Sequence, residues 1–433
     1  MKKILYVVLD GVGDRPCAAL GGRTPLEAAA TPFLDRLVAR AQTGLMDTIA
    51  AGVAPESDAA VMSILGYDLD RYYTGRGPLE SHGAGLEVRD GDIAWRANFG
   101  TVDGSWKIID RRVGRNLGDP EAQELAEAVE ASVRLPEAGF EFRHTLGHRA
   151  CLVIRRPGTV LSGEVDNCDP GYRRHGAFSV AVPNPGDRVQ EAAALDGSAA
   201  ARIAAELTNE FMRRSYEILD GHPVNRRRRE EGKMAGNMIL LRDAGNRLPK
   251  LPSLEERFGV RFGSLVEMPV EIGIAELTGM GQVPVASTAE DPEAGYRDWS
   301  ARTVSGLREF GGLYVHLKGP DLFGHDGDAA GKRANIEQID RFYFGPLMAE
   351  LTPAGVVVAV TADHSTPCGL GAHSADPVPL LIATDGLEAE GAPKFAESAC
   401  ARGRLGRIRG PELLPRLVEL ARAAGQEPGA RVV

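Results

Sequence analysis

Six side chains of the types that bind metals follow stretches that read as buried strands. They are Asp10, Asp321, His325, Asp363, His364 and His373. In an open parallel sheet, ligands bind beyond the carboxyl ends of the strands, so side chains from separate strand ends can converge on one cleft. A mixed set of oxygen and nitrogen ligands suits Mn²⁺, Zn²⁺, Mg²⁺ or Co²⁺. A single Asp-Gly would indicate only a turn, and a single histidine a structural residue, but the set together predicts a metal centre.

Ser57 is the candidate nucleophile. Pro55 interrupts the preceding chain, and residues 59–65 have a helical pattern, so Ser57 is expected near a helix N-terminus. Backbone N–H groups and the helix dipole favour an anion there. Serine is also a preferred N-cap, which is the simpler interpretation of Ser57 taken alone. Beside a metal centre the interpretation of Ser57 as a nucleophile is favoured, because a coordinated serine can attack phosphorus.

The elements that would position these residues indicate an α/β fold. Apolar runs at residues 4–9, 313–317, 356–361 and 379–383 read as buried strands, separated by helical patterns. This alternation predicts a mostly parallel sheet flanked by helices. The middle of the chain has shorter strand-like pieces, many glycine, proline and arginine breaks, and a long helical pattern over residues 188–219. We therefore predict a core formed by residues 1–70 and 250–433, with a smaller α+β lobe, residues 71–249, inserted between its two parts.

Composition narrows the class of partner. The 433 residues carry a formal net charge of −10, which disfavours nucleic acid and anionic membranes as partners. No apolar run is long enough for a membrane helix or a signal sequence, so we expect a soluble, cytoplasmic protein. Five widely spaced cysteines indicate neither a disulfide framework nor a thiolate metal site. Local basic runs at Arg111-Arg112 and at residues 226–229 suit a small anionic substrate, although each run alone could be a solvated surface. The oligomeric state stays open.

Short motifs along nearly the whole chain resemble those of archaeal-type cofactor-independent phosphoglycerate mutases, in the same order. They run from residue 8 to residue 410: VLDGVGDRP, TPLEAAATPFLDRL, ESDAAVMSILGYD, YTGRGPLE, WRANFGTVDG, DRRVGR, HPVNRRR, FGHDGD, TADHSTPC, HSADPVP and GRLGRIRG. The resemblance implies an alkaline-phosphatase-like core with an inserted substrate lobe. It also implies two divalent cations, with Mn²⁺ as the first expectation and Zn²⁺, Co²⁺ or Mg²⁺ as alternatives.

Carried over by position, the resemblance assigns roles to the residues found above. One cation would be held by Asp321, His325 and His373. The other would be held by Asp10, Ser57, Asp363 and His364. Ser57 would take the phosphoryl group of 3-phosphoglycerate, a glycolytic intermediate, and return it to the 2-hydroxyl. The matching substrate-binding positions in the inserted lobe are Arg96, Asn98, Arg111, Arg115 and Arg228.

The segment Ser287–Arg297 departs from the family pattern. Family members usually carry a Gly-x-Thr-Gly element there, followed by a threonine and a lysine, and Arg297 stands where the lysine is expected. Two alternatives therefore stay open. One is the same metal core acting on another phosphorylated or phosphonate molecule, as a phosphatase, another phosphomutase or a homoserine kinase-like phosphotransferase. The other is a non-catalytic metal-dependent binding protein, for which an intact Ser57 is hard to explain.

Overall fold

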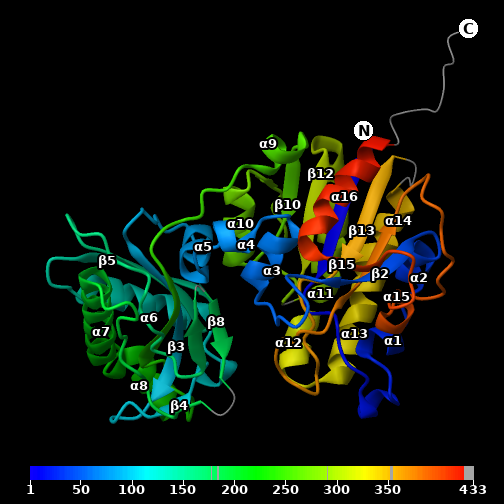
Figure 1. Cartoon of the computed structure of the whole chain (residues 1–433). Coiled ribbons are helices and arrows are strands. Elements are labelled where there is room, and N and C mark those ends of the chain that lie inside the picture. The colour runs from blue at the N-terminus through cyan, green and yellow to red at the C-terminus, as the bar shows by residue number, and fades with distance from the viewer. Residues whose placement is uncertain (177, 183–184, 290, 352–354, 424–433) are drawn as a thin grey trace, which may run out of the picture. The chain divides into compact units, whose positions relative to one another are not determined.

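The computed structural model describes residues 1–176, 178–182, 185–289, 291–351 and 355–423. The chain divides into two compact units, which are described separately (Figure 1). The core unit consists of Met1–Tyr72, Leu251–Glu267 and Ala275–Val433, and the inserted unit of Tyr73–Lys250 and Met268–Ile274. Within the described ranges, no helix combines the length and the apolar character needed to cross a membrane.

The core unit is built on one eight-stranded sheet. Its order is β11 (Gly281–Gln282), β10 (Phe262–Leu265), β12 (Gly312–Leu317), β1 (Lys3–Leu9), β13 (Val356–Thr361), β14 (Val378–Ala383), β2 (Gln42–Asp47) and β15 (Gly406–Arg409). All neighbouring strands are parallel except at β14, which runs antiparallel to β13 and β2. The predicted α/β class with a mostly parallel sheet is confirmed.

Strand β1 lies at the centre of the core sheet, and every residue of Ile4–Leu9 is fully buried. A continuous apolar run is typical of a strand covered on both faces. β1 pairs in parallel with β12, where Leu9 lies opposite Leu317, and with β13, where Val8 lies opposite Thr361. The three strands therefore end at the same edge of the sheet, which brings together the polar residues that follow them.

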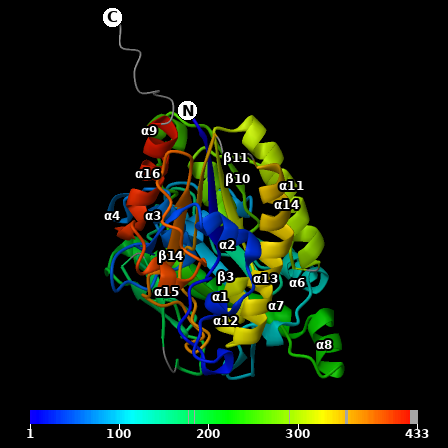
Figure 2. The ribbon, with the colours of Figure 1, turned by 90° about the vertical axis from the view of Figure 1, so that its right-hand side faces the viewer.

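Helices cover both faces of the core sheet. α11 (Pro292–Glu309) packs on β10 and β12, whereas α16 (Gly410–Ala423) packs on β1, β13 and α3 (Ser57–Ile64). Figure 2 shows α3 and α16 on one side of the sheet and α11 and α13 (Ala329–Ile339) on the other. The remaining core helices and helical turns are η1 (Ala18–Leu20), α1 (Pro25–Ala28), α2 (Pro32–Val38), α4 (Leu69–Tyr72), α9 (Leu254–Phe258), α12 (Pro320–His325), α13 (Ala329–Ile339), the π-helical turn η3 (Asp340–Phe344), α14 (Gly345–Glu350) and α15 (Glu397–Cys400).

The inserted unit has an antiparallel sheet. β3 (Ile93–Val102) pairs with β4 (Ile108–Asp110), β6 (Arg149–Arg155) and β9 (Met238–Gly245), and β5 (Gly139–Leu146) pairs with β6. β7 (Tyr172–His175) and β8 (Phe178–Ala181) form a separate hairpin. The helices of this unit are α5 (Arg76–Gly83), the short turn η2 (Val113–Arg115), α6 (Asp119–Ser132), α7 (Ala199–Asp220) and α8 (Pro223–Glu230); α10 (Pro269–Leu277) has residues in both units.

The long helix predicted over residues 188–219 is wrong for its first part. Helix α7 begins only at Ala199, and the side chain of Ser198 caps it by accepting a hydrogen bond from Ala201 N at 3.0 Å. Gly197 directly before the cap has φ +67°, a conformation that glycine adopts without strain and that ends a right-handed helix. The apolar residues between 188 and 198 fit a helical period, but this turn separates them from the helix.

Candidate metal centre

Asp10, Asp363 and His364 form the inner cluster at the carboxyl edge of the core sheet. His364 Nε2 lies 3.1 Å from Asp363 Oδ2 and 3.5 Å from Asp10 Oδ1, and all three residues are buried. The other oxygen of Asp363, Oδ1, accepts hydrogen bonds from Gly11 N and His364 N, each at 3.1 Å. These bonds hold the carboxylate so that Oδ2 faces the imidazole of His364.

Ser57 lies beside the inner cluster. It is the first residue of α3, and its hydroxyl is 3.2 Å from His364 Nε2. The N-cap of this helix is Glu56, which makes no side-chain capping bond. The cap interpretation of Ser57 is therefore wrong, because its side chain is directed toward His364. Its position at a helix N-terminus, next to histidine and carboxylates, suits a nucleophile for an anionic group.

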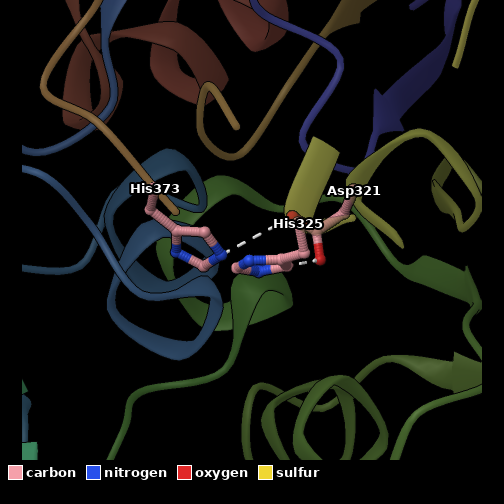
Figure 3. A group of neighbouring side chains, drawn as sticks. All are labelled: Asp321, His325 and His373. Carbon is pink, nitrogen blue, oxygen red and sulfur yellow. Dashed lines mark ion pairs between the residues drawn. The ribbon is translucent and has the colours of Figure 1, made fainter. Parts of the chain in front are cut away.

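Asp321, His325 and His373 form the outer cluster (Figure 3). Asp321 and His325 are four residues apart on α12, and His325 Nε2 lies 3.5 Å from Asp321 Oδ2. His373 Nε2 lies 3.5 Å from Asp321 Oδ1. Each histidine donates its Nδ1–H to a backbone carbonyl, His325 to Gly371 O at 3.0 Å and His373 to Pro55 O at 2.8 Å. Because a carbonyl can only accept, Nδ1 is the protonated atom in these two bonds. Nε2 of each ring is directed at Asp321, where it can bind a metal once it carries no proton.

The electrostatics of the inner cluster fit a bound cation. Asp10 Oδ1 and Asp363 Oδ2 are buried and accept no hydrogen bond from any described residue. Burial raises the pKa of Asp10 to about 7, although the charge of Lys318 opposes this rise. Repulsion from Asp363 and Asp321 adds to the rise. A buried carboxyl group with a raised pKa has too little positive charge around it to stabilise its ionised form. A bound divalent ion would supply that charge. The oxygen and nitrogen donors of both clusters suit hard or borderline divalent ions.

Two further residues of this centre escaped the sequence analysis. Lys318 Nζ lies 3.1 Å from Asp10 Oδ2, and His316, on β12 and fully buried, has Nε2 3.6 Å from Asp363 Oδ2. They precede Asp321 by three and five residues. Since strand side chains alternate between faces, residues two apart share one face. The spacing of two residues between His316 and Lys318 could have indicated that both side chains face the site. The sequence analysis treated them only as the end of a strand.

The inserted unit gathers a cationic cluster of its own. Arg96 and Asn98, both predicted, lie on β3, where Arg96 pairs across the ladder with Arg242 of β9. Asn98, in the amide orientation that satisfies both its polar atoms, accepts from Arg242 Nη1 at 2.9 Å. Burial, followed by Arg242 and Arg76, lowers the pKa of Arg96 to about 10. Arg242 and Arg76 therefore lie close enough to Arg96 to add their repulsion to the effect of burial.

Neighbouring groups extend this cluster. Burial and then Arg149 and Arg112 lower the pKa of His148 to about 3, so this imidazole is neutral among the arginines. Arg111, a third predicted residue, pairs with the buried carboxylate of Asp169, which also lies 3.3 Å from Arg242 Nη1. The structure thus brings Arg96, Asn98 and Arg111 into one region through two residues that the sequence analysis missed, Arg242 and Asp169.

Arg115 and Arg228 are placed differently. Arg115 is exposed in η2 and close enough to Arg112 to lower the pKa of that residue, after burial as the main cause. Arg228 is fully buried at the end of α8 and donates to Met234 O at 2.7 Å and Asn116 O at 3.2 Å, besides Asn116 Oδ1 and Glu121. These partners occupy its guanidinium, so Arg228 is a structural residue in this conformation. The geometry gives no support to its predicted contact with a substrate.

Arg297, in the segment that departs from the family pattern, is not part of the metal centre. It lies on α11 with half of its side chain exposed, pairs with Glu293 at 2.9 Å, and stacks over the ring of Phe342. The ammonium group nearest the inner cluster among the described residues is that of Lys318. The altered segment therefore does not place a cation at the metal centre.

The chain is similar in sequence to known proteins. A family model described as 2,3-bisphosphoglycerate-independent phosphoglycerate mutase matches residues 39–225. The protein of that name from Aeropyrum pernix is 47% identical over 425 residues, which are 96% of this chain and 99% of that protein. The protein of the same name from Methanoculleus marisnigri is 41% identical, with 97% of each chain covered.

Solved structures give the same result. The chain is similar to a cofactor-independent phosphoglycerate mutase from Thermoplasma acidophilum, with a TM-score of 0.62, 32% identity, and coverage of 97% of this chain and 100% of that one. It is also similar to a protein from Pyrococcus horikoshii, with a TM-score of 0.77, 29% identity and 99% of each chain covered. Both similarities extend over the core and the inserted unit.

Proposed function

Because this chain belongs to the family of 2,3-bisphosphoglycerate-independent phosphoglycerate mutases, which are isomerases, we propose that it interconverts 3-phosphoglycerate and 2-phosphoglycerate through a phosphoserine at Ser57. The observation that supports this most directly is the position of the Ser57 hydroxyl, 3.2 Å from His364 Nε2 and beside two clusters of metal-type ligands. A nucleophile in that place has no use in a binding protein.

Two cations are proposed to bind at the two clusters. The inner cluster, together with Ser57, would hold one, and Asp321, His325 and His373 would hold the other. When bound, divalent ions neutralise charge on the transferring oxygens and favour the deprotonated serine. Mn²⁺ is the first expectation, and Zn²⁺, Co²⁺ and Mg²⁺ suit the same donors.

Ser57 would carry the phosphoryl group between two positions of one glycerate. In the first half-reaction the Oγ–P bond forms while the bond between phosphorus and the 3-oxygen breaks, and that oxygen takes up a proton. The bound glycerate then presents its 2-hydroxyl, which loses a proton as it attacks phosphorus, and the Oγ–P bond breaks. Such transfer depends mainly on position and electrostatics. Ser57 at the N-terminus of α3 faces the phosphoryl group with backbone N–H groups beside it.

The inserted unit is proposed to bind the anionic ends of the substrate. Arg96, Arg111 and Asn98 lie in a region that gathers several guanidinium groups, and guanidinium forks bind carboxylate and phosphate bidentately. An anion would offset the repulsion from Arg242 and Arg76, which adds to burial in lowering the pKa of Arg96. Arg115, which is exposed close to Arg112, could join them.

The test is a direct assay of isomerisation. Protein loaded with each divalent ion is incubated with 3-phosphoglycerate, and 2-phosphoglycerate is followed by coupling to enolase, without 2,3-bisphosphoglycerate. Phosphate release is measured in parallel. Turnover that EDTA abolishes, with little phosphate released, supports the mutase. Steady phosphate release without isomerisation would instead identify a phosphatase, and a folded, metal-loaded protein inactive in both assays would indicate a different phosphorylated or phosphonate substrate.

A further inference from the structure

Thr366 contacts both clusters of the metal centre with one hydroxyl group. Its side chain is fully buried. Oγ1 lies 2.6 Å from Asp321 Oδ1 in the outer cluster and 3.0 Å from His364 Nδ1 in the inner cluster. Thr366 lies within the motif TADHSTPC, but neither the roles that the resemblance assigns nor the proposed mechanism uses it.

The chemistry of the three groups fixes where the protons lie. A carboxylate oxygen can only accept, so the single proton of the Thr366 hydroxyl is donated to Asp321. The hydroxyl then has only lone pairs left for His364, and Nδ1 of the imidazole must be the donor. A neutral His364 protonated at Nδ1 has its lone pair on Nε2, the atom that faces Ser57, Asp363 and Asp10.

We propose that Thr366 is a positioning residue that serves both cation sites at once: its hydroxyl sets the Nε2 lone pair of His364 toward the inner site and orients the carboxylate of Asp321 in the outer site. The inference rests on the proposed two-cation centre and deepens it. Metal-binding histidines generally donate their second ring N–H to a partner, which fixes the tautomer. Here that partner is a hydroxyl shared with a ligand of the neighbouring site.

The backbone around Thr366 holds the hydroxyl in place. Thr366 N donates to Gly13 O at 3.0 Å, and Thr366 O accepts from the buried ammonium of Lys332 at 2.9 Å. A Cβ atom at Gly11 would lie 2.7 Å from Oγ1, and one at Gly324 would lie 2.4 Å from Thr366 O. The close approach of both glycines shows that Thr366 is packed tightly between their backbones.

Removing the hydroxyl should therefore weaken both sites. In Thr366→Val, His364 Nδ1 loses its acceptor, so the imidazole shifts toward the tautomer with a proton on Nε2, which cannot bind a cation. Asp321 loses the donor that orients Oδ1. Loss of an outer-shell partner of a metal ligand typically lowers affinity about 10- to 100-fold. A change in an outer ligand such as His325 should act mainly on the outer site.

The experiment measures the two dissociation constants for Mn²⁺ by calorimetry on the full chain. The variants are Thr366→Val, Thr366→Ser, which keeps the hydroxyl, and Thr303→Val as the matched control. Thr303 is also buried in the core unit, where its hydroxyl donates to Trp299 O at 2.8 Å. We expect both constants to rise at least about 10-fold in Thr366→Val and to stay within about threefold of the wild type in the other two variants. Two-dimensional NMR of ¹⁵N-histidine-labelled protein reports the tautomer of His364, which should gain a proton on Nε2 only in Thr366→Val.

The outcomes separate this inference from the proposed function. Wild-type protein that binds fewer than two ions contradicts the two-cation centre itself. Two ions in the wild type with unchanged constants in Thr366→Val, or with only one constant changed, overturn the coupling role of Thr366. If Thr366→Val does not fold, Thr366→Ala, which adds no atom to the site, replaces it with the same expectation.

Discussion

The imidazole rings of His364 and His373 stack with their centroids 3.6 Å apart and their planes 20° from parallel. His364 belongs to the inner cluster and His373 to the outer cluster. Their Nδ1–H groups donate to different acceptors: that of His364 to Thr366 Oγ1 and that of His373 to Pro55 O. The two clusters therefore form one continuous centre, joined by the stacked rings of His364 and His373. Ser57, which lies two residues after Pro55, is next to this pair of rings, with its hydroxyl 3.2 Å from His364 Nε2.

Ser57→Ala should abolish turnover. The variant removes the only atom proposed to carry the phosphoryl group, so we expect less than a few per cent of wild-type isomerisation in the enolase-coupled assay. Ser63→Ala is the matched control, because Ser63 lies on the same helix with its buried hydroxyl donating to Thr48 O at 2.5 Å. It should keep most of the activity. Activity above a few per cent in Ser57→Ala, with the Ser63→Ala control fully active, would contradict the phosphoserine mechanism.

Cation binding should strengthen as the pH rises. Burial raises the pKa of Asp10 to about 7, and Glu56 together with Asp321 raises the pKa of His373 to about 10 despite burial, which lowers it. Both groups must lose a proton to bind a cation, so the apparent affinity for Mn²⁺ should rise from pH 6 to pH 8, with protons released. Without metal, the raised pKa of Asp10 means that its contribution to stability is fully present below about pH 4 and is lost as the pH rises through about 7. Calorimetry in two buffers of different ionisation enthalpy measures the released protons, and an affinity independent of pH would contradict the expectation.

The central strands and the metal-type residues could be predicted because they follow from local rules. Consecutive apolar residues such as Ile4–Leu9 indicate a strand buried on both faces, and a parallel sheet collects polar residues at its carboxyl edge. The start of α7 could not be placed by periodicity, because the turn at Gly197 interrupts a pattern that continues on both sides. That error concerns one residue's backbone conformation.

Residues that depend on tertiary contacts could not be predicted. Thr366 acquires its importance only because Asp321 and His364 meet on either side of its hydroxyl. Arg228 stands in a run of four arginines without apolar periodicity, so the sequence does not show which of them faces the interior of the inserted unit. The resemblance to the family motif selected Arg228 as a ligand of the substrate, whereas in this structure Arg228 is a buried partner of Glu121.

Lys332→Met should destabilise the core unit strongly. Lys332 is fully buried and donates to Asp14 Oδ2 and Thr366 O at 2.9 Å each and to Gly13 O at 3.2 Å. Without the ammonium, the buried carboxylate of Asp14 is left without its cation, which costs about 3–5 kcal/mol. The control Arg333→Met breaks a half-exposed pair with Glu337 on the same helix and should cost less than about 1 kcal/mol. Urea unfolding of the metal-free proteins compares the two, and equal losses would contradict the assigned role of Lys332.

Lys318→Met should impair the enzyme far more than Arg297→Met. Lys318 Nζ lies 3.1 Å from Asp10 Oδ2 and opposes the rise in the pKa of that carboxyl group. Its loss should raise the pKa of Asp10 further and reduce kcat/KM at pH 7 at least about 10-fold, with partial recovery at higher pH. Arg297 is exposed and pairs only with Glu293 among the described carboxylates within 4 Å. A pH profile of kcat/KM for both variants tests this, and an effect of Arg297→Met equal to that of Lys318→Met would mean that the altered segment acts in the reaction.

Arg96→Met and Arg228→Met should have opposite effects. Arg96 pairs with Glu80 at 3.4 Å, but it also lies among guanidinium groups that, after burial, lower its pKa to about 10. Its removal relieves that repulsion, and Glu80 keeps its second partner, Arg76, at 2.8 Å. We expect little loss of stability and a rise in KM for 3-phosphoglycerate of at least about 10-fold, since a charge-assisted contact to the anion is lost. Arg228 is fully buried against Glu121 and Asn116, so its removal should cost about 3 kcal/mol or more and leave KM unchanged in the protein that remains folded. Thermal unfolding and steady-state kinetics on both variants separate a residue that binds the substrate from one that holds the inserted unit together; a raised KM in Arg228→Met with unchanged stability would return this arginine to the substrate site.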